Sequence, residues 1–201
     1  MQVLEDGINN LWPTPVYKTS IDTELCDKLL NILLQEIDFE SYSNNRKNLF
    51  HLDNPIMKEF RQEVVKIFGE YFDKALDKNL EDFNTSYKAW ATGKPGTYSM
   101  ATHNHSGSPF VSVFYIFAQE EDLGGELVLN DPRANANRGY MEAFQEPFRP
   151  LRHKPVTGDV LVFPGYLYHA VDPFMAKLRI AIPVDLFLDG KVDSDDSWME
   201  N

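Results

Sequence analysis

The sequence is poor in the residues that build disulfide and thiolate sites. Its 201 residues include one cysteine, Cys26, which excludes an intramolecular disulfide framework and a cysteine-bound zinc site. Cys26 lies in an apolar helical pattern, so we expect a small buried side chain rather than a catalytic thiol, and a reducing compartment. If the protein binds a transition metal, most ligands must come from the five histidines: His51, His103, His105, His153 and His169.

Long apolar runs and an excess of positive charge are also missing. No window approaches the roughly 20 apolar residues that a membrane-spanning helix needs, and no targeting segment is visible. Acidic residues outnumber basic ones 31 to 19, and the net charge of −12 disfavours binding to phosphate backbones or anionic membranes. We therefore expect an intracellular, cytoplasmic protein that binds neither nucleic acid nor membrane. The sequence leaves its oligomeric state open.

The chain reads as one domain over residues 1–188, followed by an acidic tail over residues 189–201. Its first part, residues 20–82, is helical. Apolar residues recur with helical spacing after Asp22 or Thr23, either of which can cap a helix, and a second helix is expected to begin at Asn54-Pro55.

From residue 85 the apolar pattern changes from helical to strand-like. Eight short β-rich runs without intervening helices favour an antiparallel barrel or a two-sheet jelly roll over residues 85–188, with the two helices bracing one outer face. The long connection from Asp131 to Arg152 is a candidate lid. The predicted strands are Ser86–Thr92, Tyr98–His105, Phe110–Ala118, Glu126–Leu129, Arg152–Val156, Asp159–Phe163, Leu167–Val171 and Leu178–Phe187.

Three of the histidines have a spacing that suits a metal site. His103 and His105 lie two residues apart in an extended run, so both side chains are expected on the same face of a strand. Imidazole is a good ligand for iron, zinc, copper or nickel, and His169 in a later strand is the best third donor. A solvated polar strand end explains the His103/His105 pair equally well from spacing alone.

Arg179 lies in an apolar alternating strand, Leu178-Arg179-Ile180-Ala181-Ile182. A cation that points inward from such a strand is costly without an anionic partner, and a guanidinium is suited to bidentate binding of a carboxylate. An outward-facing arginine that pairs with a surface acid is the alternative, and spacing does not separate the two.

Residues 86–188 resemble the non-haem Fe(II), 2-oxoglutarate-dependent dioxygenases of the prolyl-hydroxylase-like type, including microbial and viral branches. The family's fold is a double-stranded β-helix, a cupin-like jelly-roll barrel. The resemblance rests on the order and spacing of Trp90-Ala91, His103-Asn104-His105, the strand 111–116, Gly124-Gly125-Glu126-Leu127, the segment 158–164, His169 and Arg179.

The resemblance also implies roles for single residues. His103 and His169 would be iron ligands, while Arg179 would bind the far carboxylate of 2-oxoglutarate, with Tyr115 or Tyr98 donating a further hydrogen bond. The family has an acid where this chain has His105, so either three histidines hold the iron or another acid, such as Asp131, substitutes. Asp131 precedes a proline and is more simply explained as a turn residue.

The implied activity uses Fe(II), 2-oxoglutarate and O2 to hydroxylate a C–H bond of a peptidyl substrate, with proline as the first candidate, or of a small molecule. Two alternatives stay open. One is a cupin-like three-histidine metal dioxygenase or isomerase that does not use 2-oxoglutarate. The other is a non-catalytic barrel that binds a ligand or a partner.

Overall fold

The computed structural model describes residues 13–39, 47–93, 96–118, 124–133, 149–176 and 178–188, without the side chains of residues 96–98 and 176. The predicted tail over residues 189–201 and most of the predicted lid, residues 134–148, lie outside the described residues. In the part of the chain that the structure describes, every helix is too short or too polar to cross a membrane.

Two helices precede the sheets, as the sequence predicts. Helix α1 (Thr23–Glu36) begins after Asp22, whose carboxylate accepts a hydrogen bond of 2.8 Å from the Glu24 backbone N–H. Helix α2 (Pro55–Leu76) begins after Asn54, whose side chain caps it in the same way. The 3-10 turns η2 (Leu49–His51) and η3 (Leu80–Asp82) lie before and after α2.

The larger of two antiparallel sheets has the strand order β1-β8-β5-β10-β2, and β3 also pairs with β10. The smaller sheet has the order β4-β9-β6-β7. The strands of the larger sheet are β1 (Tyr17–Ser20), β2 (Thr85–Ala89), β3 (Thr92–Gly93), β5 (Phe110–Phe117), β8 (Asp159–Pro164) and β10 (Ile180–Leu188). Those of the smaller sheet are β4 (Gly96–His103), β6 (Leu127–Leu129), β7 (Leu151–His153) and β9 (His169–Ala176).

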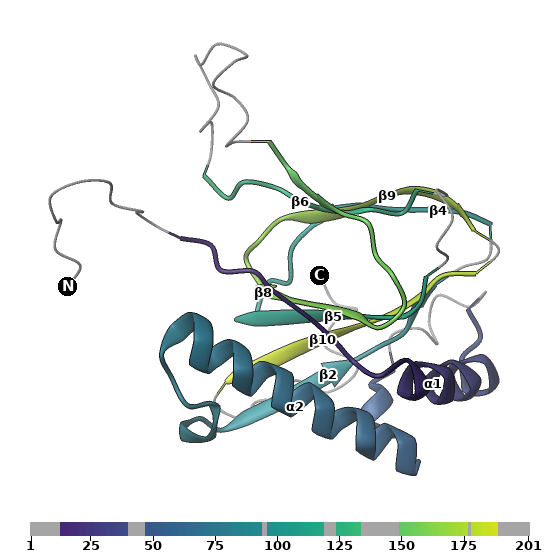
Figure 1. Cartoon of the computed structure of the whole chain (residues 1–201), viewed down its shortest axis with the longest axis horizontal. Helices are drawn as coiled ribbons and strands as arrows, with labels where there is room; N and C mark the ends of the chain where they lie inside the picture. The colour runs from purple at the N-terminus through teal and green to yellow at the C-terminus, as the bar shows by residue number, and fades with distance from the viewer. Residues whose placement is uncertain are drawn as a thin grey trace, which may run out of the picture.

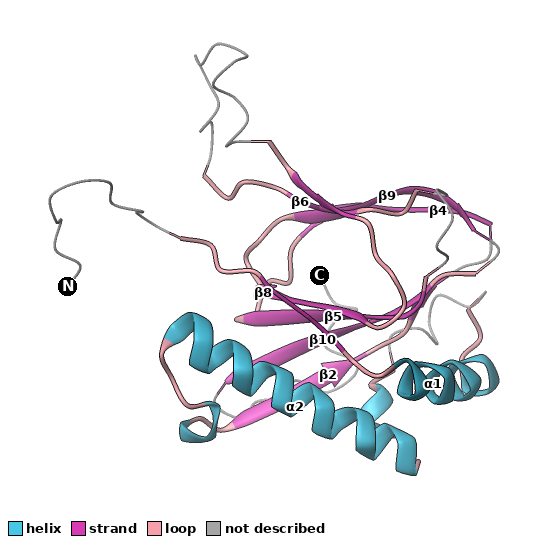
Figure 2. Cartoon of the chain, in the orientation of Figure 1, coloured by secondary structure: helices cyan, strands magenta, loops and turns pink. Residues whose placement is uncertain are grey.

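The two sheets lie face to face, and α1 and α2 cover the outer face of the larger one (Figure 1). Colouring by secondary structure shows the same division, with both helices on one side of the strands (Figure 2). The predicted mainly β fold with two bracing N-terminal helices is confirmed.

Alternate side chains of the larger sheet enter two different cores. Phe114 and Ile182 point toward the helices, where the Phe114 ring makes an edge contact with Phe60 at 4.9 Å between centroids. Tyr115 and Ala181, their neighbours in sequence, point toward the smaller sheet. The helices therefore seal one face of the larger sheet with apolar contacts and leave its other face to the space between the sheets.

Several predicted strands differ from those observed. The run Ser86–Thr92 is two strands, because Pro183 on β10 has no N–H to donate where Trp90 and Ala91 pass it. The run Leu167–Val171 begins at His169 and continues to Ala176. Strand β1 was not among the predicted strands and pairs with β8.

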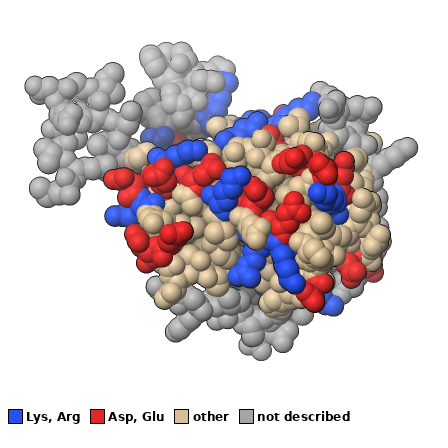
Figure 3. Space-filling view, turned by 60° about the horizontal axis from the view of Figure 1, so that its bottom comes forward, with Lys and Arg blue, Asp and Glu red and all other residues tan. Residues whose placement is uncertain are grey.

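Acidic and basic side chains are interspersed on the helix-bearing side of the molecule (Figure 3). Ion pairs along α2 join Lys58 to Asp53, Lys66 to Glu63 and Lys74 to Glu70. The net charge of −12 therefore does not appear on this side as a field of one sign.

Candidate metal centre

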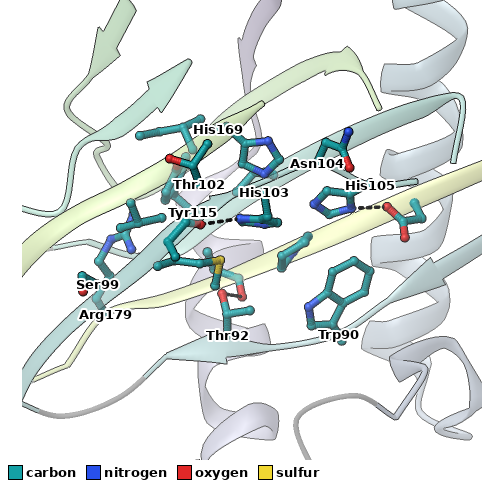
Figure 4. Close-up of a pocket in the computed structure, with 18 of the residues that line it drawn as sticks. Trp90, Thr92, Ser99, Thr102, His103, Asn104, His105, Tyr115, His169 and Arg179 are labelled. Atoms are coloured by element: carbon teal, nitrogen blue, oxygen red, sulfur yellow. Dashed lines mark hydrogen bonds and ion pairs between the residues drawn. The ribbon is translucent and has the colours of Figure 1, made fainter. Parts of the chain in front are cut away.

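A cavity of about 600 Å³ opens between the two sheets. Its lining comes from both, since Tyr115 and Asp185 belong to the larger sheet and His103 and His169 to the smaller one. The predicted site residues His103, His105, His169, Tyr115 and Arg179 all line it (Figure 4).

The three predicted histidines lie together. His103 ends β4 and His169 begins β9, and the two residues are register partners whose ring centroids are 4.3 Å apart. One ring nitrogen from each of His103, His105 and His169 lies within 4.8 Å of the other two. His51, in η2, and His153, in β7, are not in this group.

Hydrogen bonds fix the orientation of each ring. The Nδ1 atoms of His103 and His169 lie 2.9 Å from the backbone carbonyls of Ala101 and Leu167, respectively. A carbonyl can only accept, so each Nδ1 carries the proton and each Nε2 has a free lone pair. Nδ1 of His105 lies 2.6 Å from a carboxylate oxygen of Asp185, which accepts its proton in a hydrogen bond. The Nε2 atom of His105 therefore also has a lone pair for a metal.

Burial keeps two of the rings neutral. It lowers the pKa of His169 to about 3, since the side chain is buried and the neighbouring His103 and His105 also oppose a positive charge. Burial also lowers the pKa of His103. Because neutral imidazole is the form that binds a metal, these two side chains are ready to bind one at neutral pH without losing a proton.

His105 does not lie on a strand, which corrects the prediction of one strand over Tyr98–His105. β4 ends at His103, and two backbone hydrogen bonds to Gly165, together named the Gly165 clasp, hold the residues beyond it. The His105 N–H donates to the Gly165 carbonyl and the Gly165 N–H donates to the Pro109 carbonyl, both at 2.9 Å. A Cβ at position 165 would lie 1.8 Å from the Ser108 carbonyl oxygen, so only glycine allows this approach.

This donor set fits a divalent transition metal. Three imidazole nitrogens in one cavity, with their second nitrogens hydrogen-bonded to the protein, are a common ligand arrangement for iron, nickel, copper or zinc. Asp131, the alternative ligand considered from the sequence, is not in the group. Its carboxylate binds the Arg133 guanidinium at 2.6 and 3.0 Å and the Arg133 backbone N–H at 2.9 Å, as expected for a turn residue.

Arg179 lies immediately before β10 and is buried. Its guanidinium carbon is 5.3 Å from the centre of the Tyr115 ring and 5.0 Å from that of Phe174. Burial raises the pKa of Tyr115 to about 12, so its hydroxyl keeps the proton that it can donate. Arg179 and Tyr115 thus place a cation and a hydroxyl donor at the same end of the cavity (Figure 4).

Thr92 is a further hydroxyl group that the sequence did not single out. It is the register partner of Ala181, and its Oγ1 donates to the Ala181 carbonyl at 3.3 Å. Thr92 lines the cavity, so a hydroxyl reaches this region from β3 although residue 181 has none. The backbone of Tyr98 lies on β4 opposite Phe174, and its side chain is outside the described residues.

Three other lining residues were not predicted as site residues. Asp185 contacts His105, and Lys88 is the register partner of Asp185 on β2. The Trp90 ring stacks on the ring of His105, with 5.7 Å between centroids and 27° between planes. A charged residue in an otherwise apolar strand was the available signal for Asp185, as it was for Arg179.

Residues 88–185 match the family model described as "Putative 2OG-Fe(II) oxygenase". The matched segment begins at Lys88 and ends at Asp185, so it contains all three histidines and Arg179. A comparison with curated proteins gave no match.

Solved structures of low sequence identity share the fold. A prolyl-4-hydroxylase from Pseudomonas putida has 11% identity and a TM-score of 0.63, over 88% of this chain and 87% of that one. HygX from Streptomyces hygroscopicus, with nickel, 2-oxoglutarate and hygromycin B bound, has 10% identity and a TM-score of 0.62, over 87% of this chain and 83% of that one. A prolyl hydroxylase from Trichoplax adhaerens, in complex with a peptide fragment of a hypoxia inducible factor, has 15% identity and a TM-score of 0.56, over 87% and 83%. The predicted double-stranded β-helix class is confirmed by these likenesses.

Proposed function

We propose that this protein is a dioxygenase that hydroxylates a C–H bond of a peptidyl substrate, with a prolyl residue as the first candidate, because residues 88–185 match the family model of 2OG-Fe(II) oxygenases. The observation that carries the proposal is the pairing of two sites in one cavity. Three histidines with free Nε2 atoms form one, and the buried Arg179 beside Tyr115 forms the other.

His103, His105 and His169 would hold Fe(II), and Arg179 with the Tyr115 hydroxyl would bind the far carboxylate of 2-oxoglutarate. When bound, the metal and this co-substrate supply the oxidising chemistry, in which O2 is consumed and succinate and carbon dioxide are released with the hydroxylated product. The residues of the chain orient the groups and exclude water. The almost fully buried Phe163 ring packs beside His169, and the almost fully buried Phe174 ring packs beside Arg179, so each shields one side of its neighbour from solvent.

The substrate is proposed to enter past Trp90. This ring is partly exposed beside His105, and Thr102, Asn104 and Ser106 also line the cavity with uncharged polar groups. An aromatic face with neutral hydrogen-bonding groups suits a peptide backbone that carries a compact ring. The peptide-bound Trichoplax structure supports a peptide as the kind of substrate, whereas HygX with hygromycin B supports a small molecule as the alternative.

The test combines metal binding, co-substrate binding and turnover in the full chain. We expect wild-type protein to bind Fe(II) anaerobically, to bind 2-oxoglutarate only with metal present, and to form succinate when O2 is admitted. Arg179→Met should keep metal affinity but weaken 2-oxoglutarate binding at least tenfold, because a charge-assisted hydrogen bond contributes about 1.5–3 kcal/mol. His169→Ala should abolish metal binding, and His51→Ala, outside the cavity, serves as its control.

Two results would contradict the proposal. Equal 2-oxoglutarate affinity in wild type and Arg179→Met would remove the role of Arg179, and metal-dependent oxygenation without 2-oxoglutarate would indicate the three-histidine enzyme instead. Proline-containing peptides are then assayed by mass spectrometry for the gain of one oxygen atom. Oxygenation of a small molecule and of none of the peptides would overturn the peptidyl assignment alone.

A further inference from the structure

Asp185 is a buried acid on the face of β10 that lines the cavity. Its exposed fraction is 1%, and the rest of the strand, Ile180–Leu188, is apolar. Burying a carboxylate in such a strand is costly unless it is paired. The contact that the structure gives it is the His105 ring nitrogen at 2.6 Å, and both side chains are at least nine-tenths buried.

The hydrogen bond to Asp185 replaces one that the other two histidines make locally. Nδ1 of His103 and Nδ1 of His169 each donate to the carbonyl two residues earlier in the chain. His105 lies beyond the end of β4, and its Nδ1 bonds instead to a residue 80 positions away, on the opposite sheet. The direction of the His105 Nε2 lone pair thus depends on Asp185.

Asp185 is also the one acid among the described residues that line the cavity. Three neutral imidazoles leave a bound dication with its full charge, so a nearby carboxylate has an electrostatic role to fill. Lys88 lies opposite Asp185 in the register, and oppositely charged neighbours across strands stabilise a sheet. The carboxylate is therefore held in place by the sheet and contacts the metal cluster through a ligand ring.

We propose that Asp185 is the anionic positioning residue of the metal centre and acts through His105. It holds the His105 ring with Nε2 toward the other two histidines and places a negative charge one imidazole away from the ion, without occupying a coordination position. The inference rests on the proposed function for the three ligands. It adds a fourth protein residue that determines metal affinity and the electron density on the metal.

The test uses EDTA-treated full-length protein titrated with Co(II) and followed by visible absorption. Asp185→Asn keeps an oxygen that can accept the hydrogen bond from His105 but removes the charge, whereas Asp185→Ala removes both. We expect Co(II) affinity to fall about 10–100-fold in Asp185→Asn, the range found for residues that orient metal ligands, and at least as far in Asp185→Ala. Asp159→Asn is the matched control, because Asp159 is a buried acid paired with a histidine, His153, outside the group of three.

A spectroscopic signature separates an electronic role from mere support of the fold. At saturating Fe(II) and 2-oxoglutarate under anaerobic conditions, loss of the charge should shift the metal-to-ligand charge-transfer band of Asp185→Asn to higher energy, because the iron becomes less electron-rich. The shift is measured on folded, fully loaded protein, so reduced stability cannot cause it.

The possible outcomes are distinct. Wild-type affinity and an unshifted band in Asp185→Asn would overturn the role of the charge, and wild-type affinity in Asp185→Ala would overturn the positioning role as well. Equal losses in Asp159→Asn would also overturn the proposal, since they would reflect general destabilisation. If the wild-type chain itself binds no Co(II), the proposed function fails together with this inference, whereas failure confined to the Asp185 variants leaves the proposed function standing.

Discussion

Gly165→Ala is the substitution that most directly tests how the backbone positions the metal site. Gly165 follows β8 and contacts the segment between β4 and β5, where its carbonyl accepts from the His105 N–H and its own N–H donates to the Pro109 carbonyl. An added Cβ would lie 1.8 Å from the Ser108 carbonyl oxygen and 3.2 Å from that of His105. The first distance is far shorter than a van der Waals contact, and the obstacle is backbone rather than a side chain that could rotate away.

The size of the effect follows from this geometry. To restore an ordinary contact, the 105–108 segment must move by more than about 1 Å, and a misplacement of that size can cost a site about 100-fold. Loss of the two backbone hydrogen bonds adds about 1 kcal/mol each, so we expect a total of about 2–4 kcal/mol of lost stability. For a domain of this size the melting temperature should fall by roughly 4–16 °C.

The assay is thermal unfolding of the metal-free protein together with Co(II) titration of the folded protein. Gly69→Ala is the control, because Gly69 is in α2 with no atom within 4 Å of an added Cβ. That change should raise stability by about 0.5–1 kcal/mol, since alanine is the better helix former, and should leave Co(II) affinity unchanged. Wild-type stability and wild-type Co(II) affinity in Gly165→Ala would refute the role given to the clasp.

Three further predictions follow from single side chains. Tyr115→Phe removes one hydroxyl worth about 0.5–1.5 kcal/mol, so the KM for 2-oxoglutarate should rise roughly 2–10-fold in succinate-release kinetics, with kcat little changed. Asn48→Ala removes the buried amide that bonds the Tyr87 carbonyl and the Ala89 N–H, both at 3.1 Å, and should cost about 2–3 kcal/mol in urea unfolding. In metal-free protein, the unfolded chain binds a proton at His169 below about pH 6.5, whereas the folded chain does so only near its pKa of about 3. Stability is therefore complete above pH 6.5 and falls as the pH drops toward 3, by about 2 kcal/mol between pH 7 and pH 5 from this residue alone, as urea unfolding at the two pH values would measure.

Features that depend on neighbouring residues were predictable from the sequence. The caps at Asp22 and Asn54 mark the observed starts of α1 and α2, because a cap is a contact between a side chain and the next few backbone groups. The interruption of the predicted strand at Trp90 was not predictable. It arises from Pro183, which lies opposite Trp90 only when β2 and β3 have paired with β10. No single segment of the sequence shows which strands will pair.

At the metal site, too, contacts between residues far apart in the sequence could not be predicted. Spacing and resemblance singled out His103, His105 and His169, but the predicted reason was partly wrong, since His105 is placed by a clasp to Gly165 and not by the alternation of a strand. The argument that singled out Arg179, a lone charge in an apolar run predicted to be a strand, applies equally to Asp185 six residues later. Its partner is 80 residues away, so the sequence could indicate that Asp185 needs a partner but not that the partner is His105.

The division of the site between the two sheets has a physical consequence for how it works. His103 and His169 are register partners within the smaller sheet, so a metal bound to them joins strands that are already hydrogen-bonded. Asp185 and Tyr115 belong to the larger sheet, as does the strand that follows Arg179. A dicarboxylate held between the metal and Arg179 would therefore link the two sheets across the cavity, and its binding energy would stabilise their relative placement. Without it, the His105–Asp185 contact joins the loop after β4 to β10 at this site.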